Sequence, residues 1–329
     1  MDAIPPDDPT DPWAEEDRQP PEPPWPDPPP EPDRWRPWVT YTLVGIDTAV
    51  LLLMTLAGGA TDTSVLMRFG AQTSAAVWSG DWWRLFTPLF LHAGLTHLAF
   101  NMWALYSLGP VVERFFGRLR FLGIYLTAGL AGNVLFLLAG DPFVPSVGAS
   151  GAIFGLFGAL VVFGLAHRRH LRPSFWRSVL VPIAINLAYG LVAPGINNWA
   201  HLGGLAGGMA AAAVIGLPAR RPLLPRWMGA VLAALLVAGA IQGTRPPGWY
   251  VAFNSGIDLA NADRWQEAVP AFEAAVAGRP DWAVAHYDLG LAYAHSGRPA
   301  DAVAAFQRAL SLDPAFTPAR DRLKEVLGP

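Results

Sequence analysis

A serine and a histidine lie far apart in this sequence, each within a run of apolar residues. Ser150 begins an uncharged apolar run that extends to Ala166, and His201 lies inside a second apolar run. Polar side chains within a membrane are costly and usually functional. A hydroxyl within hydrogen-bonding reach of an imidazole can act as a nucleophile with its general base, which is the chemistry that cuts peptide bonds.

Small residues could bring these two side chains together. Gly204 and Gly208 follow His201 by three and seven residues, so all three share one face of a helix. The run after Ser150 carries a similar stripe of Gly151, Gly155 and Gly158. Glycine faces let helices pack with their backbones nearly touching. Taken alone, Ser150 could be a packing residue, and His201 could bond a carbonyl of a neighbouring helix.

A second polar pair, His97 and Asn101, shares one helix face because its members lie four residues apart. An amide and an imidazole are suitable donors to the oxyanion of an acyl-transfer intermediate, where one donor contributes ~3 kcal/mol. The alternative is hydrogen bonding between helices. We expect His92 to face water or lipid headgroups. A metal site built from the three histidines lacks a supporting carboxylate or thiolate, so we expect no metal.

Composition indicates a membrane protein. The 329 residues are 52% hydrophobic, the mean hydropathy is +0.29, and the apolar residues are clustered. The net charge of −3 comes with no basic stripe, so we expect no nucleic-acid partner. The absence of cysteine excludes disulfides and a cysteine nucleophile. Residues 1–37 are acidic and proline-rich, which predicts a disordered cytoplasmic tail, with proline-rich docking as the alternative.

About seven membrane spans are predicted, because a helix needs ~20 residues to cross a bilayer. They lie near residues 38–57, 89–108, 119–139, 150–166, 178–192, 198–217 and 227–241. The first six would form a core over residues 38–217, and residues 218–245 would add the seventh span with its linker. Basic residues gather in alternate short loops. They are Arg34, Arg36, Arg114, Arg118, Arg120, Arg168, Arg169, Arg172, Arg177, Arg220, Arg221 and Arg226.

This charge distribution predicts a multi-pass protein of the inner or plasma membrane with a cytoplasmic N-terminus. Ser150 and His201 would then lie near the extracytoplasmic face. Seven spans would place the C-terminal region, residues 249–329, on that same side.

The C-terminal region repeats with a period of 34 residues. The matched pairs are Gly256 and Gly290, Ala268 and Ala302, Phe272 and Phe306, Ala275 and Ala309, and Pro280 and Pro314. This period is typical of tetratricopeptide repeats, here two helix–turn–helix units with a capping helix over residues 317–327. Such a short array could bind an extracytoplasmic peptide or protein, or only cap the membrane domain.

Taken together, these motifs resemble the rhomboid family of intramembrane serine proteases over residues 40–217. The residues that carry the resemblance are His97 to Asn101, Gly148 to Gly151, and Ala200-His201 with Gly204 and Gly208. A seventh span followed by repeats resembles a subset of bacterial rhomboids. The resemblance implies an all-α polytopic membrane bundle of six helices plus a seventh span, with a small helical repeat domain. It also implies transmembrane protein substrates within the lipid bilayer and no cofactor.

The resemblance further implies a role for each residue. Ser150 would be the nucleophile and His201 its base, without a third acidic residue. His97, Asn101 and the backbone N–H of Ser150 would hold the oxyanion, with Gly148 keeping the backbone open beside the scissile carbonyl. An aromatic residue at Phe154 would stack on the base, although the tyrosine hydroxyl of some relatives is missing here.

Two loop features complete the resemblance. Arg84, before the second span, and Glu113, after it, would be scaffold residues, and residues 58–87 would form a brace in the outer leaflet. A rival reading is a catalytically inactive rhomboid-like chaperone or a scaffold that acts through the repeats. Inactive members usually lose the serine or the histidine, and this chain keeps both.

Overall fold

The computed structural model describes residues 35–168, 171–193, 195–216, 225 and 227–327. Within these ranges the chain is helical, which confirms the all-α prediction, and the only β pairing is an isolated bridge between Gln72 and Ser146. The predicted disordered tail lies almost wholly outside the described residues.

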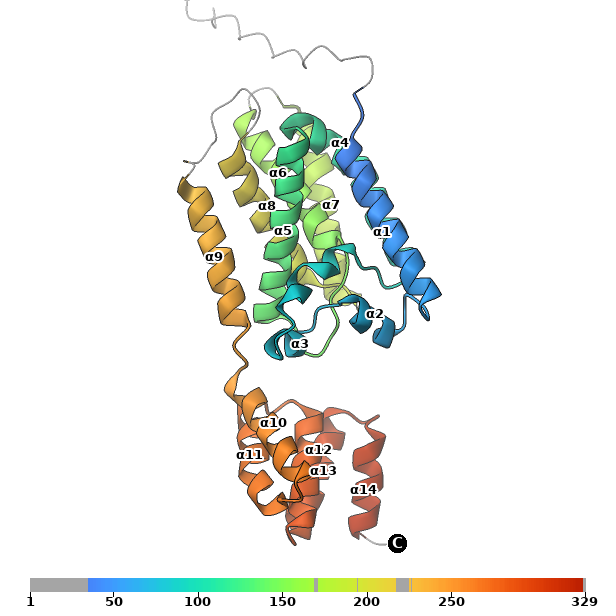
Figure 1. Cartoon of the computed structure of the whole chain (residues 1–329), viewed down its shortest axis with the longest axis vertical. Helices are drawn as coiled ribbons and strands as arrows, with labels where there is room; N and C mark the ends of the chain where they lie inside the picture. Colours follow the sequence, from blue (N-terminus) through green and yellow to red (C-terminus); the bar gives the residue numbers. More distant parts are fainter. Residues whose placement is uncertain (1–34, 169–170, 194, 217–224, 226, 328–329) are drawn as a thin grey trace, which may run out of the picture.

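Seven helices form the upper bundle in Figure 1. They are α1 (Trp38–Leu56), α4 (Leu95–Phe116), α5 (Arg118–Ala139), α6 (Ser150–Ala166), α7 (Pro173–Val192), α8 (Asn198–Ile215) and α9 (Trp227–Gly243). Three of them, α1, α5 and α7, are long and apolar enough to cross a membrane, and α6 is apolar but shorter. The full count of seven spans therefore remains a prediction.

The second predicted span is wrong at both ends. Two short 3-10 turns, η1 (Trp82–Leu85) and η2 (Thr87–Phe90), occupy its expected start. Helix α4 begins only after Gly94, whose φ of 96° is unfavourable for other residues. It then continues through Pro110 to Phe116, so Glu113 lies within the helix and not in the following loop.

Glu113 joins α4 to the start of α1. Its buried carboxylate accepts hydrogen bonds from the backbone N–H groups of Val39 and Thr40 at 3.2 and 2.9 Å, and from the Thr40 hydroxyl at 2.8 Å. These bonds satisfy N–H groups that a helix leaves free in its first turn. Glu113 is thus a structural residue at the end of the bundle remote from Ser150.

The segment between α1 and η1 folds into two short helices, α2 (Thr63–Phe69) and α3 (Ser74–Trp78), shown at the lower end of the bundle in Figure 1. Asp62 and Thr73 cap these helices with their side chains. Arg84 fixes their arrangement by donating to the carbonyls of Met67 and Ala71 at 2.7 and 3.0 Å.

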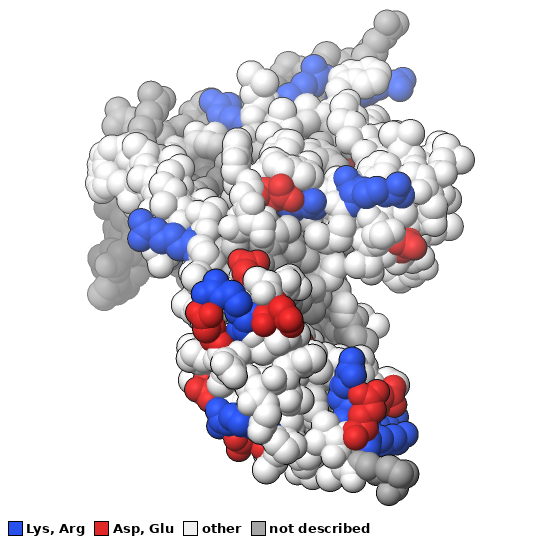
Figure 2. Space-filling model, turned by 60° about the horizontal axis from the view of Figure 1, so that its bottom comes forward, with Lys and Arg blue, Asp and Glu red and all other residues white. Residues whose placement is uncertain are grey.

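Five further helices form the C-terminal domain: α10 (Gly248–Asn261), α11 (Trp265–Gly278), α12 (Ala283–His295), α13 (Pro299–Leu312) and α14 (Thr317–Leu327). The 34-residue period reappears as equivalent contacts. A Cβ on Gly256 would lie 2.7 Å from the Phe272 ring, and one on Gly290 would lie 2.5 Å from the Phe306 ring. Acidic and basic side chains gather on this domain in Figure 2, whereas the visible surface of the bundle is largely uncharged.

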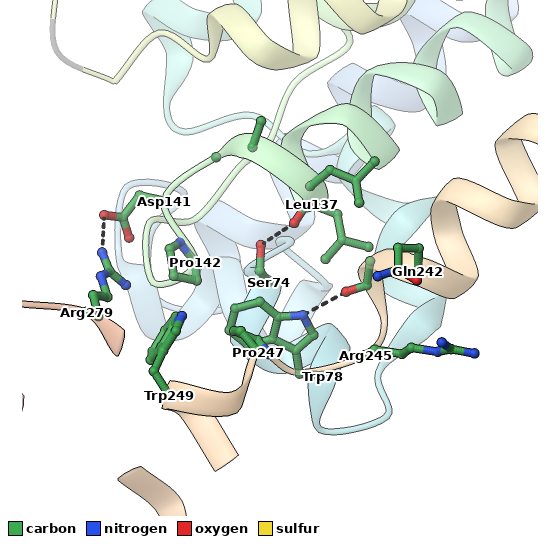
Figure 3. Close-up of a pocket in the computed structure, with 14 residues that line it drawn as sticks. Ser74, Trp78, Leu137, Asp141, Pro142, Gln242, Arg245, Pro247, Trp249 and Arg279 are labelled. Carbon is green, nitrogen blue, oxygen red and sulfur yellow. Dashed lines mark hydrogen bonds and ion pairs between the residues drawn. The ribbon is translucent and has the colours of Figure 1, made fainter. Parts of the chain in front are cut away.

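The repeats meet the bundle at the end where α5 stops and α6 starts (Figure 1). The Trp78 indole N–H donates to the Gly243 carbonyl at 2.7 Å, and Arg279 pairs with Asp141 at 3.2 Å (Figure 3). Gly243 ends α9 and packs against Leu137 near the end of α5. Helix α9 therefore runs along α5 and ends near the end of α5, where the repeats begin.

Candidate active site

Ser150 and His201 come together although 51 residues separate them. Ser150 is the first residue of α6, and His201 lies in the first turn of α8. The Ser150 Oγ and the His201 Nε2 are 2.9 Å apart. This is the hydrogen-bonding distance that serine activation requires.

Glycine packing between α6 and α8 makes this approach possible, as the glycine stripes predict. A Cβ on Gly204 would lie 1.9 Å from the Gly151 carbonyl oxygen, and one on Gly208 would lie 2.2 Å from the Gly155 carbonyl oxygen. Helix α8 also packs closely on α5, where a Cβ on Gly203 would lie 2.6 Å from the Ala131 carbonyl oxygen. Two neighbouring helices thus fix the position of His201.

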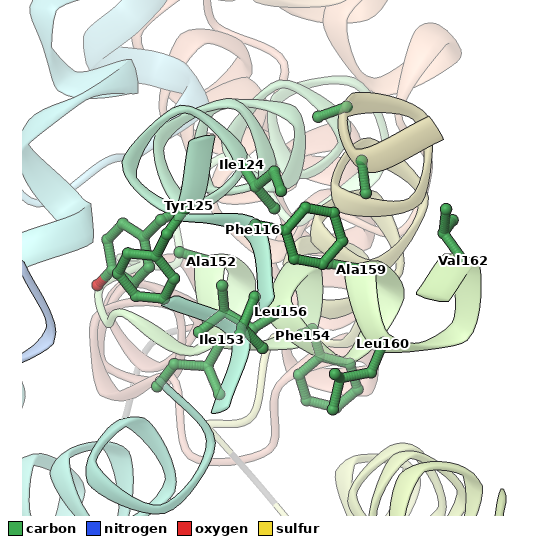
Figure 4. Packing of buried hydrophobic residues seen from close by; sticks show 14 of the residues in the cluster. Phe116, Ile124, Tyr125, Ala152, Ile153, Phe154, Leu156, Ala159, Leu160 and Val162 are labelled. Carbon is green, nitrogen blue, oxygen red and sulfur yellow. The ribbon is translucent and has the colours of Figure 1, made fainter. Parts of the chain in front are cut away.

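The Phe154 ring stacks on one face of the His201 ring. The two ring centroids are 4.2 Å apart and the planes differ by only 7°. Phe154 belongs to the buried cluster on α6 that Figure 4 shows, so its own position is fixed by packing. The His201 Nδ1 is buried and has no hydrogen-bond partner among the described residues. In the part of the chain that the structure describes, Ser150 and His201 thus form a pair with no carboxylate bonded to the imidazole.

His97 lies against Gly148, two residues before Ser150. Gly148, with a φ of 124°, allows this approach, since a Cβ there would lie 2.9 Å from the His97 Nε2 and 3.7 Å from the Ser150 Oγ. The Ala93 backbone N–H donates to the His97 Nδ1 at 3.3 Å. A neutral His97 ring therefore carries its proton on Nε2, the nitrogen that faces Gly148.

Asn101 lies one turn further along α4 and is buried. Its side-chain amide donates one hydrogen bond to the His97 carbonyl at 2.9 Å, which leaves its second N–H for another acceptor. The structure therefore joins Asn101 to His97, and the close approach of His97 to Gly148 joins the pair to the segment that leads to Ser150.

The expectation for His92 is wrong. Its side chain is fully buried, and its ring centroid lies 5.2 Å from that of His97. The reason is that η2 ends at Phe90 and α4 begins only at Leu95, so His92 lies in the connection between them and not on the surface of a spanning helix.

Sequence reasoning missed Asn197 and Ser146, which connect the starts of the two helices. The Asn197 Oδ1 accepts from the Ala200 N–H at 3.0 Å and so caps α8. Its Nδ2 donates to the Ser146 hydroxyl at 2.7 Å, four residues before Ser150. An asparagine just before a predicted helix is a signal for the cap. The bond to Ser146 has no local sequence signal.

Sequence reasoning also missed Asp47, a carboxylate inside the first apolar helix. Its side chain is fully buried, and neither oxygen has a partner among the described residues. The hydroxyl of Tyr125 on α5 is likewise buried without a partner in that part of the chain. A charge within a predicted span is itself a signal that could have identified this residue.

Two family models match the chain. The model described as a Rhomboid domain matches residues 79–218, and the one described as a Tetratricopeptide repeat matches residues 253–315. Both matches fall on the segments that the sequence motifs had indicated, so the recognition of a rhomboid-like region followed by repeats is confirmed.

The chain is also similar to several curated proteins. It is 42% identical to "Rhomboid protease GluP" of Bacillus subtilis over 204 residues, which cover 62% of this chain and 40% of that protein. It is 31% identical to "Rhomboid protease AarA" of Providencia stuartii over 226 residues, which cover 60% of this chain and 80% of that protein. The match to the Bacillus protein thus spans less than two thirds of its length.

Proposed function

The chain belongs to the rhomboid family, and on that premise we propose that it is an intramembrane serine endopeptidase acting on transmembrane-helix substrates. The observation that carries the proposal is the distance of 2.9 Å between the Ser150 Oγ and the His201 Nε2. Ser150 is the nucleophile and His201 is its general base. The His201 Nδ1 has no hydrogen-bond partner among the described residues, which supports a dyad, because a triad would place a carboxylate beside this atom.

The reaction proceeds in two steps. The His201 Nε2 takes the Ser150 proton while Oγ bonds the substrate carbonyl carbon. His201 then gives that proton to the leaving amine as the C–N bond breaks, which leaves an ester on Ser150. Water, deprotonated by His201, then attacks the ester carbonyl carbon. The bond from that carbon to Oγ breaks, His201 returns the proton to Oγ, and the second product leaves with a carboxyl group. The stacking of Phe154 keeps the imidazole in the plane that both transfers need.

The oxyanion is held by His97, Asn101 and the backbone N–H of Ser150. We expect Asn101→Ala to lower kcat by roughly 10²-fold to 10³-fold, the loss that follows removal of one oxyanion donor, with little change in KM. Steady-state cleavage of a reporter transmembrane substrate in detergent measures both constants.

Asn186→Ala is the matched control for Asn101→Ala. Each amide donates to the carbonyl four residues earlier at 2.9 Å, but Asn186 is exposed on α7. Equal losses of kcat in the two variants would contradict a role for Asn101 at the oxyanion.

A substrate helix enters laterally past α7 and unwinds near its end, because an intact helix hides its carbonyls in its own hydrogen bonds. The loose packing of α7 supports this route. Only Val179 and Ile183 of this helix are buried, whereas Leu180, Ile185 and Leu191 are exposed.

The proposal includes an orientation. The N-terminus is cytoplasmic, and the dyad and the repeats face the extracytoplasmic side, as the sorting of arginines predicts. The turn between α4 and α5 and the start of α7, which carry Arg118 and Arg177, lie at the end of the bundle opposite the start of α6 (Figure 1). The repeats then recruit an extracytoplasmic peptide or protein.

A serine-reactive phosphonate probe tests the proposal. We expect the purified protein to be labelled on Ser150, located by peptide mass spectrometry, and His201→Ala to lose the label because the hydroxyl is no longer activated. The alternative function, an inactive chaperone or scaffold acting through the repeats, predicts no label on Ser150 in either protein.

A further inference from the structure

The repeats contact the loop that leads to the nucleophile. This lead-in loop comprises residues 140–149, between the end of α5 and Ser150. Arg279, directly after α11, places its Nη2 atom 3.2 Å from the Asp141 Oδ2. Figure 3 shows the two side chains facing each other, one from the repeats and one from the lead-in loop.

Aromatic rings strengthen this contact. Phe143 of the lead-in loop stacks on Trp282 of the repeats, with centroids 4.9 Å apart and planes 20° apart. The Arg279 guanidinium lies 5.5 Å from the Phe143 centroid and 5.1 Å from that of Trp249. Cations and ring faces attract each other. Arg279 therefore connects the repeats to the lead-in loop in two ways, by an ion pair with Asp141 and by a cation–π contact with Phe143.

The lead-in loop also makes hydrogen bonds with the bundle. Its Pro142 carbonyl accepts from the Ala75 N–H at 3.1 Å, and the Gly148 N–H donates to the Pro88 carbonyl at 2.9 Å. Between these points Ser146 receives the bond from Asn197. The repeats are thus one of several supports of a short segment that ends at Ser150.

The remaining space between the bundle and the repeats is not completely filled by side chains. A cavity of about 580 Å³ lies between the two domains, lined among others by Trp78, Leu138, Gln242 and Trp249. The docked arrangement therefore depends on Arg279 and on a small aromatic cluster, in which Trp78 and Phe143 of the bundle meet rings of the repeats. The Phe143 ring and the Asp141 carboxylate both belong to the lead-in loop, so Arg279 contacts this loop at two side chains.

We infer that the docked repeats hold the lead-in loop in place, which makes Arg279 a positioning residue for Ser150. A ligand that moves the repeats relative to the bundle then changes the rate of the reaction. This inference rests on the proposed function and adds a regulatory input to it. Arg279 acts through Asp141 and Phe143 and touches no reacting atom.

The test compares Arg279→Glu with the unchanged protein, both in detergent micelles. The substitution sets a new carboxylate against those of Asp141 and Asp281 and removes the cation from the rings. We expect the rate of Ser150 labelling by the phosphonate probe to fall about tenfold, since small misplacements of reacting groups have effects of this order or larger. We expect kcat to fall by the same factor and KM to change less.

Asp141→Asn provides a second variant that keeps an oxygen able to accept from the Phe143 N–H, as Asp141 does at 2.9 Å. With Arg279→Gln it forms a double-mutant cycle, and we expect the double variant to be no slower than either single one. Arg264→Glu is the control, because Arg264 pairs with Glu267 inside the repeats. It should label at the unchanged rate.

Labelling of Arg279→Glu at the rate of the unchanged protein would overturn the inference. So would a loss shared equally by Arg264→Glu, because it would reflect damage to the repeats and not their docking. A protein with no labelling before any substitution would instead contradict the proposed function. Far-ultraviolet circular dichroism of each variant identifies one that fails to fold, and the Asp141→Asn cycle then decides.

Discussion

Replacing Ser150 with alanine will abolish cleavage of a transmembrane substrate, with a loss of at least ~10⁴-fold in kcat. The substitution removes the oxygen that bonds the substrate carbon and leaves the His201 Nε2 without its partner at 2.9 Å. His201→Ala will have a similar effect. The double variant will be no slower than either single variant, because residues that act as one unit lose their contribution together.

Ser107→Ala is the matched control for Ser150→Ala. The Ser107 hydroxyl also lies on a helix of the bundle, but it donates to the Trp103 carbonyl of its own helix. Cleavage of a reporter substrate is measured by the appearance of the product on a gel, and comparison of shed fragments from cell membranes extends the test to natural substrates. Cleavage by Ser150→Ala at more than a trace rate would contradict the dyad.

The approach of Ser150 to His201 could be predicted because it depends on local patterns. The spacing of Gly204 and Gly208 from His201 defines one face of a helix, and the stripe after Ser150 defines another. Two glycine-lined helix faces are expected to pack against each other, because only small residues let the two backbones come so close. The observed starts of α6 and α8, at Ser150 and Asn198, agree with the predicted spans.

The path of the chain before α4 could not be predicted in the same way. Residues 89–94 are apolar enough to resemble the start of a span, but a bend at Gly94 and the 3-10 turns before it depend on contacts with distant residues. Asn133 of α5, for example, donates to the Leu85 carbonyl at 2.8 Å. The burial of His92 follows from this path.

The links around the lead-in loop are similarly non-local. Asn197 and Ser146 are 51 residues apart, and Arg279 and Asp141 are 138 apart. No periodicity connects such residues, since each pair depends on how whole helices are arranged. Single-sequence reasoning therefore identifies the reacting groups more readily than the residues that position them.

Gly204→Ala will separate Ser150 from His201 without changing either of the two proposed catalytic residues. The new Cβ would lie 1.9 Å from the Gly151 carbonyl oxygen, so α6 and α8 must move apart by on the order of 1 Å. A shift of that size is enough to lower the rate roughly 10²-fold. Overpacking of this kind also costs about 1–3 kcal/mol of stability, which a thermal melt in detergent will detect as a lower Tm.

Gly45→Ala is the control for Gly204→Ala. Gly45 lies within α1, and a Cβ there would meet nothing within 4 Å. Alanine should be tolerated at this position and should favour the helix by about 1 kcal/mol. Full cleavage by Gly204→Ala with a lowered Tm would show that the glycine contact stabilises the bundle without setting the dyad. Full cleavage with an unchanged Tm would contradict the close contact of α6 with α8, and with it the reason that the Ser150 hydroxyl reaches His201.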